Sequence, residues 1–215
     1  MLDCGNRLIF GSLERDVARL SKRTSTFVMN YRQMKEKTCT KRSVHSTAWK
    51  PPAMGLLKLN FDGGKVGEHG WGGGFAVRGF DGEIILAGVQ QCQGTMAPVI
   101  GEAQACLFAL RSAQKYGLSH LCVEGDCLPL IQKLQNKTVD DNCIGLIIFD
   151  ILSIIEQVEF IAFSFVKREG ITVAHALAHW LPMTWGSRIW TDNVPADIVA
   201  RASEDMYAYI DSNSI

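Results

Sequence analysis

The stretch Lys58-Leu59-Asn60-Phe61-Asp62-Gly63-Gly64 alternates apolar and polar side chains and then runs into two glycines. A period of two predicts a β-strand with one buried face, and we place this strand at 57–62. A glycine-rich turn containing Gly63, Gly64, Gly67 and Gly70 is expected to follow and to lead into a second strand at 71–78. The Asp-Gly pair at 81–82 predicts a tight turn into a third strand at 84–91. Together these segments predict an antiparallel meander.

A helix from Pro98, about sixteen residues long, carries apolar side chains at helical spacing, and an apolar strand at 120–126 comes after it. A crossover helix allows the first and fourth strands to be parallel neighbours with a right-handed connection. The later apolar patterns predict two helices, a fifth strand and a last helix, at 128–134, 144–155, 160–166 and 172–180. The sequence therefore predicts an α/β fold, βββαβααβα, in which helices pack on a five-stranded mixed sheet.

The chain of 215 residues divides into three parts by composition. Pro51 and Pro52 mark a boundary near residue 50. Residues 1–50 form a basic leader, expected to be partly helical (around 13–20 and 27–37) or disordered. This leader holds 11 Lys and Arg against 4 Asp and Glu, whereas the remainder holds 11 against 18. A basic arm suits polyanion binding, or it is simply a solvated leader. Residues 51–182 form the domain, and 183–215 form a C-terminal extension without a clear period.

Composition excludes several classes of protein. Charged residues at 20% and aromatic residues at 9% exclude a wholly disordered chain, and the absence of an 18-residue apolar run excludes a transmembrane helix. Seven cysteines without a CxxC pair predict a reducing intracellular compartment, whether nucleus, cytoplasm or organelle. The glycines from 63 to 74 lead into a strand and lack a GK[ST] motif, so no nucleotide cofactor is expected. His175 and His179 are four residues apart, but they lack the glutamate of the zinc-protease HExxH motif.

Three carboxylates are candidates for catalysis. Asp62 ends the first predicted strand, Glu102 lies in the first turn of the crossover helix, and Asp126 ends the fourth strand. The C-terminal ends of parallel neighbours lie together, so the three side chains are expected to converge. Such a cluster repels itself unless divalent cations neutralise it, and oxygen ligands suit Mg²⁺. Taken singly, each has a structural alternative, as a turn residue, a favourable helix N-terminal charge and a helix N-cap respectively.

Six motifs, in this order, resemble the ribonuclease H type-1 family, and in particular its plant branch related to retroelement (non-LTR) reverse transcriptases. The resemblance covers the segment 49–180. The motifs are Trp49-Lys50-Pro51-Pro52, Lys58-Leu59-Asn60-Phe61-Asp62-Gly63-Gly64, Gly72-Gly73-Gly74-Phe75-Ala76-Val77-Arg78, Gly101-Glu102-Ala103-Gln104-Ala105, Val123-Glu124-Gly125-Asp126, and Lys167-Arg168-Glu169-Gly170 with Val173-Ala174-His175-Ala176-Leu177-Ala178.

The resemblance implies a metal-dependent endonuclease that cleaves the RNA strand of RNA–DNA hybrids with two metal ions, Mg²⁺ or alternatively Mn²⁺. Asp62, Glu102 and Asp126 match three of the four metal-binding carboxylates of the family. His175 stands at the fourth position, where it would bind a metal weakly or shuttle a proton, or is a surface helix histidine. Ile171 stands where the family commonly has Asn.

The resemblance implies that the partner is an RNA–DNA hybrid or another nucleic acid. No association with a membrane is expected, and we expect the chain to be a monomer. Lys167 and Arg168 are candidates for contacts with phosphates, or they are solvated charges at a strand end. Two functions stay open at this point. The chain is either an active hybrid nuclease, or a weakly active or inactive ribonuclease H-like module that binds nucleic acid or a protein partner.

Overall fold

The computed structural model describes residues 48–180 and 185–214. The helices predicted around 13–20 and 27–37 lie outside these ranges. Within them, no helix combines the length and the apolar character that crossing a membrane requires.

The described residues form one six-stranded mixed sheet in the order β5-β4-β1-β2-β3-β6. Strand β1 pairs in parallel with β4, which pairs in parallel with β5, and the remaining neighbours are antiparallel. The strands are β1 (Leu57–Val66), β2 (Gly70–Arg78), β3 (Ile84–Gln93), β4 (His120–Gly125), β5 (Phe160–Phe165) and β6 (Gly186–Trp190). The predicted α/β class, the order of elements along the chain and the parallel pairing of the first and fourth strands are confirmed, and β6 extends the five predicted strands by one.

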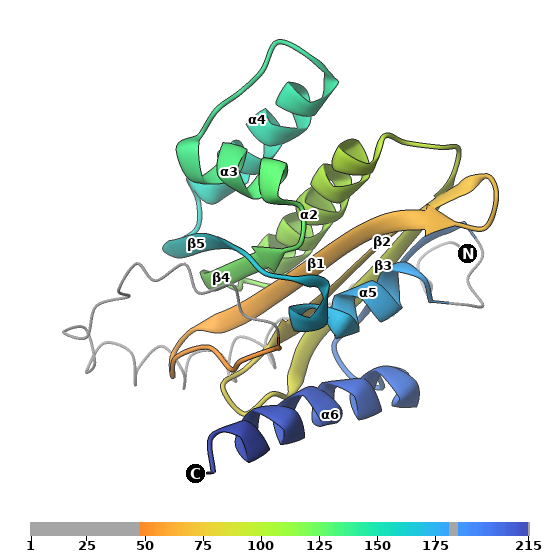
Figure 1. The fold of residues 1–215 in the computed structure, drawn as a ribbon. Coiled ribbons are helices and arrows are strands. Elements are labelled where there is room, and N and C mark those ends of the chain that lie inside the picture. The colour runs from red at the N-terminus through yellow and green to blue at the C-terminus, as the bar shows by residue number, and fades with distance from the viewer. Residues whose placement is uncertain (1–47, 181–184, 215) are drawn as a thin grey trace, which may run out of the picture.

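Helices cover both faces of this sheet (Figure 1). One face carries α2 (Pro98–Lys115), α3 (Leu128–Asn136) and α4 (Cys143–Ile155), and the other carries α5 (Thr172–Ala178) and α6 (Ala196–Ser212). A short 3-10 turn, η1 (Arg168–Gly170), precedes α5. Successive side chains of β2 point to opposite faces of the sheet, so this strand contributes to the apolar core on each face. Phe75 and Val77 pack with the first group of helices, and Ala76 packs with the second.

The predicted glycine-rich turn is wrong in its extent. Gly63 and Gly64 lie inside β1, where they pair with Gly73 and Gly72 of β2. Glycine usually indicates a turn when only the neighbouring residues in the sequence are considered. Here its missing side chain instead lets helices approach the sheet. A Cβ on Gly63 would lie 2.6 Å from the carbonyl oxygen of Gly101 in α2. The β1–β2 hairpin therefore turns only beyond Val66.

The C-terminal segment, for which the sequence gives no clear period, contains β6 and α6. The expectation of no clear period is wrong for α6, because its least exposed apolar side chains, Ile198, Ala202, Met206 and Tyr209, lie on one helical face. Only Ile198 and Ala202 of this helix are buried, while Val199, Tyr207 and Ile210 are exposed apolar side chains. These exposed apolar side chains make the period hard to recognise in the sequence.

A buried arginine fastens α6 to the sheet. Arg78 of β2 is fully buried, and its Nη1 lies 2.7 Å from Oδ2 of Asp205. Its other donors reach the carbonyl oxygens of Ala202 at 2.6 Å and Gly82 at 3.0 Å. The ring of Trp49 stacks on the guanidinium, with 3.6 Å from Cζ to the ring centroid. One buried charge thus joins the segment before β1, the strand β2 and the last helix.

Helix α5 lies directly on the backbone of β2. A Cβ on Gly74 would overlap the amide nitrogen of Ala178, and it would lie 2.5 Å from the carbonyl oxygen of Ala174. A Cβ on Gly72 would overlap the carbonyl oxygen of Ala178. The backbone of α5 cannot give way without moving the whole helix, so these glycines set its distance from the sheet.

We predict that Gly74→Ala lowers the free energy of unfolding by about 1–3 kcal/mol or more, because the added methyl forces α5 away from β2. Urea unfolding of the purified chain measures this change. Gly170→Ala is the matched control, since a Cβ there would lie 3.4 Å from its nearest neighbour, Val166. Its effect should stay within about 1 kcal/mol. Equal losses in the two variants would contradict a close contact between α5 and β2.

Candidate active site

The sequence suggests that Asp62 ends the first strand, but β1 continues to Val66 and Asp62 lies within it. Its side chain is fully buried. The parallel pairing between β1 and β4 ends at Asn60 opposite Glu124, so Asp62 lies just beyond the point where the two strands separate. On the other side of β1, Asp62 lies opposite Gly74 of the antiparallel strand β2, and the missing side chain of Gly74 lets α5 pack close to the sheet. The carboxylate is therefore enclosed by elements on both sides.

Glu102 and Asp126 approach Asp62 from α2 and from the end of β4. Glu102 lies beyond the first turn of α2, and Asp126 directly follows β4. Cys127, not Asp126, occupies the N-cap of α3, so the structural alternatives of a helix N-terminal charge and an N-cap do not apply. Oxygen atoms of Asp62, Glu102 and Asp126 all lie within 4.8 Å of one another. The structure thus brings the three predicted carboxylates together.

The environment of Glu102 opposes its negative charge. Burial is the main cause, and the neighbouring charges of Asp62 and then Asp126 add to it, which raises the pKa of Glu102 from an ordinary 4.5 to about 9. A hydrogen bond from the amide of Gly63 favours the charged form, while one between Glu102 and Asp126 favours the protonated form. Without a cation, Glu102 therefore holds a proton at neutral pH.

Two buried oxygens of this cluster have no hydrogen-bond partner among the described residues, Oδ1 of Asp62 and Oε2 of Glu102. Buried polar atoms are usually paired, and an orphaned carboxylate oxygen costs free energy. A divalent cation between the carboxylates would satisfy both oxygens and cancel the mutual repulsion. The donor set, carboxylate oxygens only, fits Mg²⁺ and Mn²⁺.

His175 joins the cluster from α5. The side chain of His175 is 37% exposed, and its Nδ1 lies 2.8 Å from Oδ2 of Asp62. One turn later, His179 places its ring 4.4 Å from that of His175, centroid to centroid. The ligand atoms of Asp62, His175 and His179 also lie within 4.8 Å of one another. The sequence offered a signal for His179 in its spacing from His175, but without the zinc-protease glutamate that signal was set aside.

Ile171 serves packing. It is buried and forms a small apolar cluster with Val166 and Ala174. It also occupies the N-cap position of α5, where its side chain can accept no hydrogen bond from the helix. With Ile171 in place of a polar residue such as Asn, the helix that carries His175 begins without a polar side chain at its N-cap.

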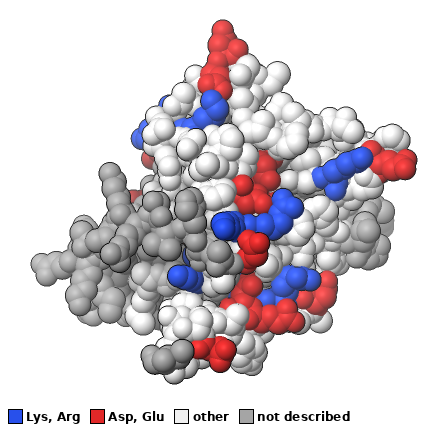
Figure 2. All heavy atoms as spheres, viewed as in Figure 1, with Lys and Arg blue, Asp and Glu red and all other residues white. Residues whose placement is uncertain are grey.

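Arg168 lies at the rim of the carboxylate cluster. Its side chain is 61% exposed, and Nε lies 3.0 Å from Oδ2 of Asp126. Lys167, the preceding residue, is exposed. Acidic and basic side chains lie next to each other at the centre of the face seen in Figure 2. Of the two candidate substrate-binding residues, Arg168 is therefore paired with a carboxylate of the cluster, and Lys167 is its exposed neighbour in the sequence.

A family model described as reverse transcriptase-like matches residues 60–181. The chain belongs to the reverse transcriptase-like family. The matched segment contains Asp62, Glu102, Asp126 and His175. No curated protein sequence matches this chain.

Solved structures with the same fold include ribonuclease H domains. Ribonuclease H1 from the halophilic archaeon Halobacterium salinarum is 19% identical, with a TM-score of 0.52 over 57% of this chain and 94% of that chain. The N-terminal ribonuclease H domain of rv2228c from Mycobacterium tuberculosis is 18% identical, with a TM-score of 0.52 over 70% and 98%. LC11-RNase H1 in complex with an RNA/DNA hybrid is 19% identical, with a TM-score of 0.51 over 56% and 92%.

These comparisons confirm the ribonuclease H-like fold that the motifs indicate. At identities of 18–19% the likeness extends to the fold alone. The plant branch stays a prediction, as do the monomeric state and the intracellular compartment.

We predict that the metal-free chain loses stability as the pH rises from about 4.5 to about 9, the range in which folded Glu102 keeps a proton that the unfolded chain has released. Unfolding then releases a proton, so rising pH favours the unfolded state. Glu102→Gln should remove this loss and be more stable than the parent at alkaline pH, by on the order of a few kcal/mol.

Urea unfolding at a series of pH values, with a chelator present, measures the difference. Glu156→Gln, at an exposed position after α4, is the control and should keep the parental pH profile. A parental profile in Glu102→Gln as well would show that Glu102 is ionised at neutral pH.

Proposed function

We propose that this chain is a metal-dependent nuclease that hydrolyses the RNA strand of RNA–DNA hybrids. The observation that carries the proposal is the convergence of Asp62, Glu102 and Asp126, whose oxygens lie within 4.8 Å of one another. Two of these buried oxygens are without a hydrogen-bond partner in the described part of the chain, which supports a cation site. The fold is shared with LC11-RNase H1, whose structure contains an RNA/DNA hybrid.

In this proposal Asp62, Glu102 and Asp126 hold two divalent cations, with Asp62 central because it contacts both the acidic cluster and His175. When bound, such ions activate water and neutralise the charge that develops on a phosphodiester. Glu102 gives up its proton to become a ligand, so binding of the ions releases a proton. His175 would hold Asp62 in place through Nδ1, which lies 2.8 Å from Oδ2 of that carboxylate.

Substrate choice in this proposal comes from the shape of the hybrid. A hybrid duplex has a wide, shallow minor groove that displays the 2′-hydroxyls of the RNA strand. Arg168 and Lys167 would bind phosphates next to the carboxylate cluster, and Arg168 would exchange its contact with Asp126 for a phosphate. Binding should therefore weaken with salt, because each contact of a Lys or Arg side chain with a phosphate releases counterions from the nucleic acid.

A second candidate function is nucleic-acid binding without cleavage. Two contacts favour it, since Arg168 lies 3.0 Å from Asp126 and His175 lies 2.8 Å from Asp62. Arg168 partly neutralises Asp126, and His175 occupies an oxygen of Asp62, so both contacts would compete with cations for these carboxylates. A cleavage assay separates the two functions, because in the second case hybrid is bound and stays intact with either metal.

We predict that Asp62→Asn lowers cleavage of a labelled RNA–DNA hybrid by about a thousand-fold or more with Mg²⁺ or Mn²⁺, because the amide is neutral and a poor ligand for both ions. The measurement is the single-turnover rate on a gel. Circular dichroism checks that folding is intact, and a fluorescence binding assay follows the hybrid. Asp211→Asn, at an exposed position of α6, should cleave at the parental rate. Parental activity in Asp62→Asn would remove Asp62 from the site.

We predict that His175→Asp raises the Mg²⁺-supported cleavage rate, by roughly ten-fold, and narrows the difference between Mg²⁺ and Mn²⁺. The reason is that carboxylate oxygen suits Mg²⁺ better than imidazole nitrogen does. Rates with each metal, at several concentrations, measure both effects. His69→Asp is the control because His69 is exposed at the turn between β1 and β2. Identical rates for His175→Asp and the parent would show that the fourth position does not limit the reaction.

A further inference from the structure

A second group of potential metal ligands shares only Asp62 with the carboxylate cluster. It contains Asp62, His175 and His179, whose ligand atoms lie within 4.8 Å of one another. The first group offers oxygen alone, whereas this one offers one carboxylate and two imidazoles. The two groups therefore differ in the class of cation that each would prefer.

The hydrogen bonding of His179 leaves one of its nitrogens available. Nδ1 lies 3.0 Å from the carbonyl oxygen of His175, and since a carbonyl only accepts, Nδ1 carries the proton. In the neutral ring Nε2 then has a free lone pair. Metal-bound histidines usually donate their other N–H to a carbonyl or carboxylate in this way, which fixes the orientation of the ring.

The position of the His179 ring depends on a glycine. A Cβ on Gly64 would lie 2.8 Å from Cε1 and 2.9 Å from Nε2 of His179. Gly64 is two residues after Asp62 on β1, so both positions face the same side of the sheet. The missing side chain thus lets Nε2 lie over the strand surface from which Asp62 projects.

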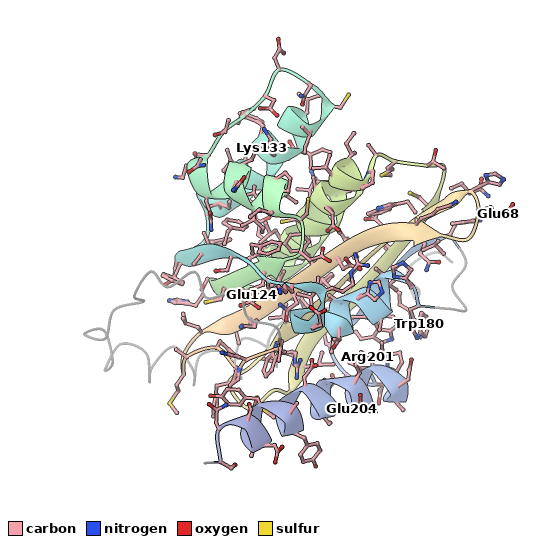
Figure 3. The ribbon with its side chains drawn as sticks, in the orientation of Figure 1. Glu68, Glu124, Lys133, Trp180, Arg201 and Glu204 are labelled. Atoms are coloured by element: carbon pink, nitrogen blue, oxygen red, sulfur yellow. The ribbon has the colours of Figure 1, made fainter. Side chains whose placement is uncertain are left out.

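The end of α5 is held in place beyond His179. The side-chain amide of Gln91 donates to the carbonyl oxygen of Trp180 at 3.0 Å, and the ring of Trp180 packs edge-on against Trp190 of β6 at 5.3 Å between centroids. Trp180 is labelled in Figure 3, where it lies just past the C-terminal end of α5. His179 is therefore exposed but sits on a fixed backbone.

Asp62 contributes a buried oxygen that points to a ligand. Its side chain is fully buried, and Oδ1 lacks a hydrogen-bond partner among residues 48–180 and 185–214. Oδ2 lies 2.8 Å from Nδ1 of His175. Two ligands on one cation with bonds of about 2.0–2.2 Å lie roughly 3 Å apart, so this pair has the spacing of two ligands, and a bound ion would replace the proton between them, which is released to solvent.

We propose that Asp62, His175 and His179 form a site for a divalent transition-metal ion of the Mn²⁺-to-Zn²⁺ series, adjacent to the carboxylate cluster. Imidazole binds these ions well and binds Mg²⁺ poorly, and a set of two histidines and one carboxylate is typical of Zn²⁺ and Fe²⁺ centres. The role of this ion in catalysis rests on the proposed function, but its binding does not. Of the two cations in the proposed function, the one on the α5 side would then be this ion, and the two unlike ions would share Asp62.

The test is isothermal titration of the full chain, stripped of metal with a chelator and alkylated at its accessible cysteines, with Zn²⁺ alone and with Mg²⁺ alone. His175→Gln and His179→Gln should each weaken Zn²⁺ binding at least about ten-fold, and Mg²⁺ binding should be unchanged in His179→Gln. His69→Gln, which removes an exposed histidine away from α5, should bind Zn²⁺ as the parent does. With Co²⁺, the visible absorption of the parent should change in the two site variants alone.

Parental Zn²⁺ affinity in both His175→Gln and His179→Gln, or binding of Mg²⁺ as tight as that of Zn²⁺ at this site, would overturn the inference. Thermal melting of each variant checks folding, and the exposure of His179 makes that variant the safer one. Zn²⁺ binding that depends on both histidines, in a chain that cleaves no hybrid, would support this site and count against the proposed function. Hybrid cleavage with Mg²⁺, in a chain whose Zn²⁺ affinity is the same with and without the two histidines, would support the proposed function and contradict the transition-metal site.

Discussion

The site depends on direct contact between helix backbones and a glycine-bearing part of the sheet. Helix α2 touches β1 at Gly63, and α5 touches β2 at Gly72 and Gly74. With no side chains in between, both helices lie at the shortest distance that backbone atoms allow. Glu102 on α2 and His175 on α5 consequently reach Asp62 with short side chains. Close packing here is a requirement of the chemistry and not only a source of stability.

That packing has an electrostatic consequence. It removes water from Asp62 and Glu102, and burial is the largest cause of the raised pKa of Glu102. A fourth carboxylate, at the position of His175, would add another negative charge beside Asp62. The imidazole instead makes a hydrogen bond of 2.8 Å to Asp62, which holds that carboxylate without added repulsion. The histidine thus lowers the cost of the metal-free site, at the expense of a poorer ligand for Mg²⁺.

Strand alternation and helical spacing in the sequence were enough to predict the order of elements along the chain, the crossover between β1 and β4, and the convergence of Asp62, Glu102 and Asp126. What they missed depends on tertiary contacts. Gly63 and Gly64 have the local character of a turn, and only the approach of α2 and His179 explains why they lie in a strand. The importance of His179 likewise depends on a glycine more than a hundred residues earlier, which no local pattern reveals.

The last helix shows how part of the C-terminal extension supports the site. Asp205 of α6 accepts from Arg78 at 2.7 Å and from the hydroxyl of Thr172 at 3.1 Å. Thr172 is the first residue of α5, the helix that carries both histidines. One carboxylate therefore joins the buried arginine of β2 to the start of α5, where Ile171 offers no cap. The position of His175 is thus set from two directions, by glycines beneath α5 and by α6 at its beginning.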